Sequence, residues 1–311
     1  MPLLDVTAID ILTSSEHGDK SLYGRQRLFG TLAYCSTTAA VGEILERQGI
    51  QSILLVVLAT SFTAVIPSLL LLPSTIEKKT KGDNEKNIPA STPPTSEVAP
   101  LKPKQNNVLA LLKKPSFIIF LFLVFVQGVS RHTLQNYLVN YLDDPKQRIM
   151  KKSTYGHTSW GMCFAEIVLF FFAKKILAKL GPARMLIVSQ LMMVIRVWAL
   201  YFLPRSENYG YLVFFIEIFK GIGSGLMQST GVHLAHAAAP RGLEATAQGF
   251  FAAVYGGVSA VAGSFIGGLL YESRDSHALI SGTAYMSTFG FVIFIFKYEI
   301  YDRYFSNNSS K

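Results

Sequence analysis

Long apolar runs recur along the chain, and they constrain its fold more than any other feature. Each is close to the roughly 20 residues that an α-helix needs to cross a bilayer. Only 16% of the residues are charged, against about 25% in soluble domains. The runs also lack the alternation of a membrane β-barrel. We therefore expect an all-α membrane protein with about eight transmembrane helices, at residues 28–45, 50–72, 116–142, 155–177, 183–203, 210–236, 245–271 and 280–301.

Two segments interrupt these runs. Residues 74–115 are rich in Pro, Lys, Ser and Thr, the composition of a disordered linker. This predicts a basic cytosolic linker between residues 1–73 and a C-terminal six-helix bundle at 116–303, with a tail at 304–311. The opening "MPLLDVTAIDIL" is too short to span. It favours the end of a helix whose first part is missing, with an amphipathic interfacial segment as the alternative.

The positive charges are distributed as membrane topology requires. If residues 1–27 are cytosolic, most of the 29 Lys and Arg fall in segments on the cytosolic side, as the positive-inside rule predicts. The exception is the basic loop "DDPKQRIMKKS" at 143–153. We expect a multi-pass protein of the lipid bilayer with both termini in the cytosol. The net charge of +9 then needs no nucleic-acid partner.

Charged side chains also lie inside the predicted spans, where each costs about 2.5–3.5 kcal/mol if unpaired. They are expected to pair or to face a polar cavity. The two acids and three bases are nearly balanced, which favours pairing around a cavity; they are Arg131, Glu166, Arg196, Glu217 and Lys220.

The run "FFIEIFKGIGSG" carries two of these charges three residues apart. Glu217 and Lys220 therefore share one helix face, which Ser224 and Gln228 continue. This polar stripe either faces a cavity or contains a self-neutralising pair that fixes helix packing. The glycines of "GIGSG" and of "GSFIG" (263–267) are expected to let another helix approach closely.

Two further sites are predicted from the residues. Glu166 lies in the middle of its span, with Arg196 as the natural partner, and could accept a proton or a hydrogen bond from a solute; a structural salt bridge is the alternative. His132, Asn136 and Asn140 recur every four residues beside Arg131. They could form a binding wall for a polar solute or hydrogen bonds between helices.

Several motifs resemble one branch of the major facilitator superfamily. "PLLDVTAIDIL…YGRQRLFGTLAY" resembles its junction of helices four and five, and "SWGMCFAEIVLFFFAKKILAKLG" is similar to its helix eight, with Glu166 at the intramembrane acid. "MLIVSQLMMVIRVWALYF" resembles helix nine, with Arg196 at its arginine. "APRGLEATAQGFF" resembles the start of helix eleven. The matching positions outside Glu166 and Arg196 are Pro2, Asp5, Tyr23, Gly24, Arg25, Arg27, Phe29, Gly30, Arg241, Ala245, Gln248 and Gly249.

The branch contains the lactose permease and nucleoside:proton symporters. Its animal members include the major facilitator superfamily domain-containing protein 6-like group. The resemblance implies a twelve-helix transporter of which this chain holds helices five to twelve and the end of helix four, so that it is N-terminally truncated. Glu217 and Lys220 fall at two ionisable positions of helix ten, but with other residue types. The resemblance therefore leaves proton coupling open.

These features predict a secondary transporter that moves a small polar solute by alternating access, with or without protons. A non-transporting receptor or interaction protein of the same fold, or an inactive fragment, is the alternative. No HExxH, Ser/His/Asp or paired-Asp signature of an enzyme occurs. His233 and His236 have no third metal ligand at a suitable spacing, so we expect neither a metal nor a cofactor.

Overall fold

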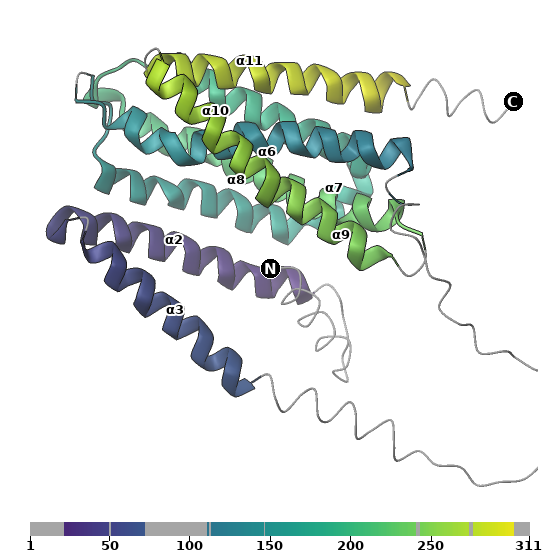
Figure 1. Ribbon diagram of the computed structural model, residues 1–311, viewed down its shortest axis with the longest axis horizontal. Helices are drawn as coiled ribbons and strands as arrows, with labels where there is room; N and C mark the ends of the chain where they lie inside the picture. Colours follow the sequence, from purple (N-terminus) through teal and green to yellow (C-terminus); the bar gives the residue numbers. More distant parts are fainter. Residues whose placement is uncertain are drawn as a thin grey trace, which may run out of the picture. The chain divides into compact units, whose positions relative to one another are not determined.

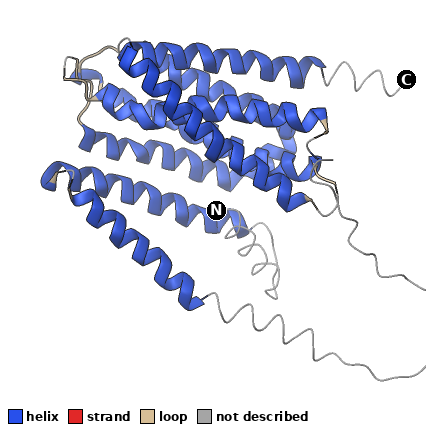
Figure 2. Ribbon diagram, in the orientation of Figure 1, coloured by secondary structure: helices blue, strands red, loops and turns tan. Residues whose placement is uncertain are grey.

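The computed structural model describes residues 22–49, 51–71, 111, 113–145, 147–240, 243–273 and 276–301. Residues 1–21, most of the predicted linker and the tail at 304–311 lie outside this part of the chain. The described residues contain helices and no strands (Figure 2). The elements labelled in Figure 1 are α2 (Leu22–Gln48), α3 (Ser52–Leu71), α6 (Pro115–Leu142), α7 (Lys152–Tyr201), α8 (Tyr211–Ala238), α9 (Glu244–Ala252), α10 (Ser259–Ser273) and α11 (Ser276–Ile295). Short helices η1 (Glu207–Tyr209), η2 (Ala253–Val258) and η3 (Phe296–Tyr301) complete them.

Eight helical stretches coincide with the eight predicted spans. α7 accounts for two of them, because its path breaks at Gly181, whose φ of 74° and ψ of 162° suit glycine alone. Pro182 follows and starts the second half, where its missing N–H is not needed. α9, η2 and α10 together form one stretch.

Among the residues that the structure describes, five stretches are both long and apolar enough to cross a membrane. They are Pro115–Leu142, Lys175–Tyr201, Tyr211–Ala238, Ala245–Glu272 and His277–Glu299. The expected all-α fold of a multi-pass membrane protein is thus confirmed.

The chain divides into two compact units, one of residues 1–42 and 106–311 and the other of residues 43–105. In the second unit, Gly49 follows α2 with a φ of 75°, and Ser52 Oγ donates a hydrogen bond of 2.7 Å to its carbonyl at the start of α3. The predicted domain limits at 73 and 116 stay a prediction.

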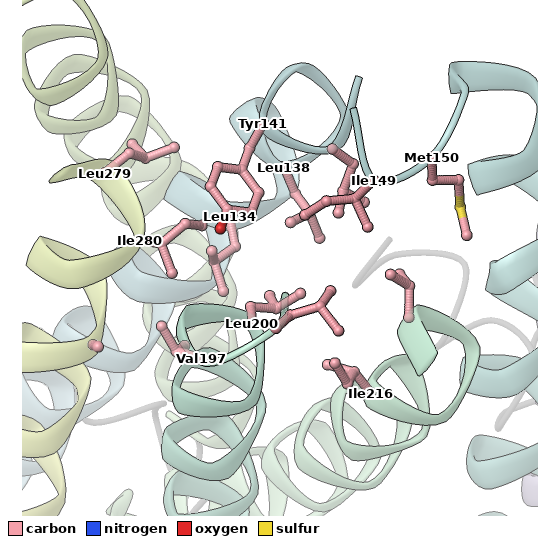
Figure 3. Packing of buried hydrophobic residues seen from close by; sticks show 14 of the residues in the cluster. Leu134, Leu138, Tyr141, Ile149, Met150, Val197, Leu200, Ile216, Leu279 and Ile280 are labelled. Carbon is pink, nitrogen blue, oxygen red and sulfur yellow. The ribbon is translucent and has the colours of Figure 1, made fainter. Parts of the chain in front are cut away.

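Two large apolar clusters and a small one, formed by Cys35, Met162 and Cys163, make up the core of the first unit among the described residues. In Figure 3, one cluster joins the ends of α6, α7, α8 and α11, and the loop residues Ile149 and Met150 fold back into it. Its members include Leu134, Leu138, Val197, Leu200, Ile216, Leu279 and Ile280. The second cluster lies near the opposite ends of the same helices, with η2 and α9, and includes Phe117, Phe120, Leu123, Leu186, Met227, Phe251 and Phe294.

Between these clusters, each of the four helices carries buried polar residues, which we call the polar layer. They are Gln127, Ser130 and Thr133 on α6; Ser189, Gln190 and Arg196 on α7; Glu217 and Ser224 on α8; and Thr283 and Ser287 on α11. Polar groups away from water must be hydrogen-bonded or line a wet cavity. The sequence order apolar, polar, apolar along each helix therefore places the candidate site in this layer.

Glycines bring the helices of the polar layer close together, as predicted. A Cβ on Gly221 would collide with the carbonyl oxygen of Met162 in α7, and one on Gly223 would lie 3.2 Å from the carbonyl oxygen of Ser189. On α10, a Cβ on Gly263 would lie 2.8 Å from the Val129 carbonyl oxygen. α8 thus approaches both halves of α7, and α10 approaches α6.

Candidate functional site

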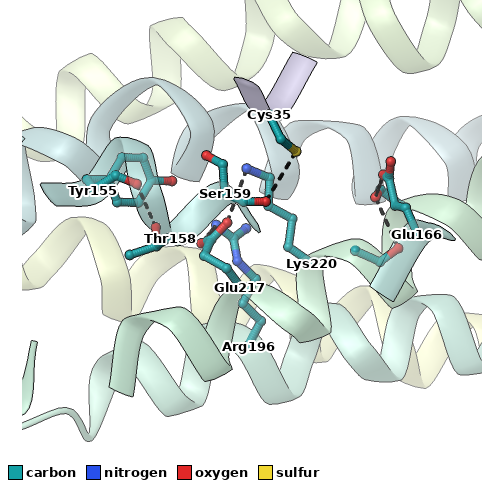
Figure 4. Close-up of polar contacts among 10 residues, drawn as sticks. Cys35, Tyr155, Thr158, Ser159, Glu166, Arg196, Glu217 and Lys220 are labelled. Atoms are coloured by element: carbon teal, nitrogen blue, oxygen red, sulfur yellow. Dashed lines mark hydrogen bonds and ion pairs between the residues drawn. The ribbon is translucent and has the colours of Figure 1, made fainter. Parts of the chain in front are cut away.

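A buried group of three charged residues lies at the centre of the polar layer. Arg196 Nη2 is 2.7 Å from Glu217 Oε1, and Lys220 Nζ is 3.2 Å from Glu217 Oε2 (Figure 4). The side chains of Arg196 and Glu217 are each 1% exposed and that of Lys220 is 10% exposed. One carboxylate thus bridges two cations, so the group keeps an excess positive charge. We call these residues the ion triad.

The predicted pairing of Arg196 with Glu166 is wrong. Arg196 lies on the second half of α7, which packs against α8, so Glu217 is its partner. Glu166 lies on the first half and accepts hydrogen bonds from Ser224 Oγ at 2.7 Å and from Thr31 Oγ1 at 3.4 Å. Glu166 is therefore held by hydroxyl groups, while Glu217 pairs with Lys220 as expected and with Arg196 as well.

A pocket with an empty volume of about 290 Å³, partly open, adjoins the ion triad. It brings together residues of α6, α7, α8 and η2, namely Gln127, Arg131, Met193, Arg196, Phe219, Lys220, Gly223, Ser224 and Tyr255. Four predicted site residues are among them: Arg131, Arg196, Lys220 and Ser224. Glu217 contacts Arg196 and Lys220, and Glu166 contacts Ser224. We call the lining residues and these two acids the pocket cluster.

Arg131 differs from the other cations of the pocket cluster. Its guanidinium carbon lies 5.0 Å from the centre of the Tyr255 ring, in the range of a cation–π contact. Within the described part of the chain, it has no carboxylate at ion-pair distance. Its Nε is buried and has no hydrogen-bond acceptor among those residues. Arg131 thus lies against an aromatic ring and has no ion-pair partner among the described residues.

Tyr255 reaches the pocket through a local departure from α-helical geometry. It lies in η2, a π-helical turn, where the wider spacing of hydrogen bonds frees backbone carbonyls. Ser259 Oγ lies 2.7 Å from the carbonyl oxygen of Val254 and 2.6 Å from that of Tyr255. His132 Nε2 lies 3.2 Å from the same Tyr255 oxygen. These contacts stabilise the turn that presents the Tyr255 ring.

Gln127 extends the pocket cluster by a chain of hydrogen bonds. Its Nε2 donates to Ser189 Oγ at 2.7 Å, and Ser189 Oγ donates to the Gly223 carbonyl at 2.7 Å. Since Ser189 uses its proton on Gly223, it must accept from the amide nitrogen of Gln127. The buried Oε1 of Gln127 then has no donor among the described residues.

Gln127 and Tyr255 were not predicted as site residues. Gln127 had a signal, because it lies four residues before Arg131 and therefore shares its helix face. Tyr255 had no such signal in the sequence. The π-helical turn around it changes which residues share a helix face, and α-helical spacing does not predict that change.

Neutral polar residues of α6 contact α10, and we call this interface the α6–α10 seam. Thr133 Oγ1 donates to the Gly263 carbonyl at 3.1 Å, Asn136 Nδ2 to Ser264 Oγ at 2.7 Å, and Tyr137 Oη to the Ser264 carbonyl at 2.8 Å. The structure thus engages Asn136 with α10 and His132 with η2, in line with the interhelical hydrogen bonds left open above.

The remaining predicted site residues lie away from the pocket. Asn140 is exposed on α6, and Gln228 is half-buried on α8 without lining the pocket. The stripe of α8 therefore contributes its first three members, Glu217, Lys220 and Ser224, to the pocket cluster.

The arrangement can bind a solute that offers hydrogen-bond acceptors or negative charge. Arg131, Arg196 and Lys220 provide charged N–H donors, and the Ser224 hydroxyl lies between the pocket and Glu166. Charge-assisted hydrogen bonds of this kind are about twice as strong as neutral ones.

Comparisons with known proteins agree with this architecture. An "Uncharacterized transporter YwbF" of Bacillus subtilis (strain 168) is 26% identical over 196 residues, which cover 61% of this chain and 46% of that protein. The chain thus spans about half the length of this relative. No solved structure matches the chain. The MFS_1 like family matches residues 1–280; the finer branch within the superfamily stays a prediction. The chain therefore belongs to the MFS_1 like family of the major facilitator superfamily.

Proposed function

We propose that this chain forms part of a secondary active transporter for a small polar solute. The observation that carries this proposal is the pocket in the polar layer, which is lined by three cationic side chains. The described part of the chain also contains five apolar helices long enough to cross a membrane. Charges inside spans are costly and mark solute or ion pathways. The transporter named among its relatives supports the same function.

Alternating access follows from the predicted arrangement of two helical bundles joined by a basic linker. In such transporters the binding site lies at the interface of the bundles, and the bundles rock around it. We propose that residues 116–303 form one bundle, that residues 1–73 belong to the other, and that both termini lie in the cytosol. The seven Lys and Arg of the segments assigned to the outside would then be the minority of the 29.

Proton coupling, where it occurs, is assigned to Glu166. The ion triad is unsuited to this role, because protonating Glu217 would leave two buried cations without their counter-charge. Glu166 instead accepts hydrogen bonds from Ser224 and Thr31. A proton on Glu166 breaks no ion pair among the described residues. It also leaves Ser224 free to turn toward the pocket, which couples the proton to the solute site.

The test uses the purified full-length protein in proteoliposomes with a pH gradient. Uptake of a mixture of sugars, nucleosides, amino acids and small organic ions is measured by mass spectrometry. We expect at least one solute to accumulate with the native protein. Glu166→Gln should abolish this uptake while the amount of folded protein in the vesicles stays the same.

Glu207→Gln is the matched control, because Glu207 is exposed in η1 and should leave uptake at the native level. If Glu166→Gln transports as well as the native protein, Glu166 takes no part in coupling. If no solute of the mixture moves, the proposal fails in favour of a receptor or interaction protein of the same fold.

A further inference from the structure

Resting on the proposed transport function, we infer that the solute carries one negative charge on a carboxylate, and that Arg131 binds it. The observation is the charge imbalance of the pocket cluster. It contains three cations, Arg131, Arg196 and Lys220, and two carboxylates, Glu217 and Glu166. One positive charge is left over, and a monoanion would neutralise it.

Arg131 is the cation of the pocket cluster that has no ion-pair partner among the described residues. Glu217 contacts both Arg196 and Lys220 within 3.2 Å, so these two cations share a counter-charge. Arg131 has no such partner in the described part of the chain and lies against the face of Tyr255. A cation held this way at the wall of a pocket attracts anions, and the ring lowers its hydration without neutralising it.

The shape of the donor favours a carboxylate. A guanidinium presents parallel N–H groups at the spacing of the two carboxylate oxygens, so one side chain can bind the group in a bidentate manner. A phosphate dianion would exceed the single excess charge of the pocket cluster. The pocket is narrow and only partly open, so the solute must be small.

Besides Arg131 Nε, two buried atoms of the pocket cluster have no partner among the described residues, Arg196 Nε and Gln127 Oε1, and Gln127 offers a contact for the other end of the solute. The Oε1 of Gln127 is buried without a donor among the described residues, and Gln127 lies one helical turn from Arg131 on the same face of α6. Buried acceptors without a donor are rare in folded proteins. A carboxylate solute that also carries a hydroxyl or N–H would supply the missing hydrogen bond.

The experiment compares solutes that differ in charge and little in shape. Proteoliposomes with the purified full-length protein are given acetate, lactate, pyruvate and glycolate, or the four corresponding neutral amides, or inorganic phosphate. We expect at least one carboxylate to enter about tenfold or more faster than its amide and faster than phosphate, as the loss of a charge-assisted hydrogen bond implies.

Arg131→Gln should remove this preference, lowering carboxylate uptake about tenfold or more, and Arg131→Lys should restore part of it. Arg47→Gln is the control, because the Arg47 side chain is 80% exposed. Since Arg131→Gln breaks no ion pair among the described residues, its melting temperature should equal or exceed that of the native protein. A lower melting temperature with unchanged selectivity would make Arg131 a structural residue and overturn the inference.

Other outcomes separate this inference from the proposed function. If the amides or a neutral solute of the broader mixture enter and no carboxylate does, the inference of an anionic substrate is wrong. The proposed transport function is then still supported. Faster uptake of phosphate than of every carboxylate also overturns it. If nothing enters from either set of solutes, the proposed transport function itself fails.

Discussion

The pocket cluster and the α6–α10 seam both place polar side chains of α6 among apolar helices, yet they differ in what meets those side chains. In the seam, Thr133, Asn136 and Tyr137 are neutral, and each donates a hydrogen bond to α10. In the pocket cluster, Arg131 is charged and Gln127 keeps an acceptor without a donor among the described residues. The hydrogen bonds of the seam are completed by protein, whereas the pocket cluster keeps polar groups without a partner among the described residues.

The difference shows how one helix serves two roles. Arg131 and Thr133 are two residues apart, which separates their directions by about 200° around the helix axis. α6 therefore carries two polar faces, one toward α8 and η2 and the other toward α10. Polarity alone does not distinguish a binding wall from a packing interface, because the neighbouring helix decides whether the hydrogen bonds are completed.

The largest effect is expected for Glu217→Gln in the pocket cluster. This substitution leaves Arg196 and Lys220 buried without their shared carboxylate. Breaking a buried ion pair from one side costs about 3–5 kcal/mol in free energy of unfolding. We expect a loss of this size, measured by thermal or denaturant unfolding of the purified protein, together with loss of uptake.

A double-mutant cycle sharpens this prediction. Arg196→Gln combined with Glu217→Gln removes one cation with the carboxylate, so the double variant should be more stable than the sum of the two single losses implies. Additive losses would mean that the 2.7 Å contact between Arg196 and Glu217 contributes little, and that the ion triad is not one electrostatic unit.

A smaller effect is expected in the seam for Gly263→Ala. The added Cβ would lie 2.8 Å from the Val129 carbonyl oxygen and 3.0 Å from the Thr133 nitrogen. Both are backbone atoms of α6, so the helices must separate, at a cost of about 1–3 kcal/mol in free energy of unfolding.

Gly249→Ala is the matched control for stability, since a Cβ at that position in α9 would have no atom of the described residues within 4 Å beyond its own helix backbone and chain neighbours. It should be neutral or slightly stabilising, because alanine is the better helix former. Equal losses for Gly263→Ala and Gly249→Ala would mean that the seam is not closely packed.

Much of the fold could be predicted from the sequence, because its signals are local. The length of the apolar runs gave the helices, and "GIGSG" indicated the close approach that Gly221 and Gly223 make to α7. The contact between Glu217 and Lys220 depends only on a spacing of three residues within one helix. Interactions within a helix can be derived from periodicity.

The partner of Arg196 could not be derived in this way. Glu166 and Glu217 are both acids in apolar spans, and periodicity does not tell which helix faces Arg196. The break at Gly181 separates the two halves of α7, and only the second half brings Arg196 to Glu217. Tyr255 was missed for a related reason, because the π-helical turn of η2 changes which side chains face the pocket.

The smallest effect is expected for Asn136→Ala in the seam. The substitution removes the 2.7 Å hydrogen bond from Asn136 Nδ2 to Ser264 Oγ. Such a bond between membrane helices contributes about 0.6 kcal/mol on average, and Ser264 keeps a second partner, because its hydroxyl donates to the Ala260 carbonyl at 2.8 Å. Unfolding measurements should therefore show a loss near 0.6 kcal/mol, with uptake unchanged.

Asn140→Ala on the same helix is the control, because the Asn140 side chain is exposed and makes no hydrogen bond with the residues that the structure describes. Its free energy of unfolding should match that of the native protein. If Asn136→Ala instead lowers uptake far more than its effect on stability explains, Asn136 contacts the solute during transport. The seam would then open toward the solute in another state of the transport cycle, and the contrast with the pocket cluster would describe one state of the protein and not a permanent division of α6.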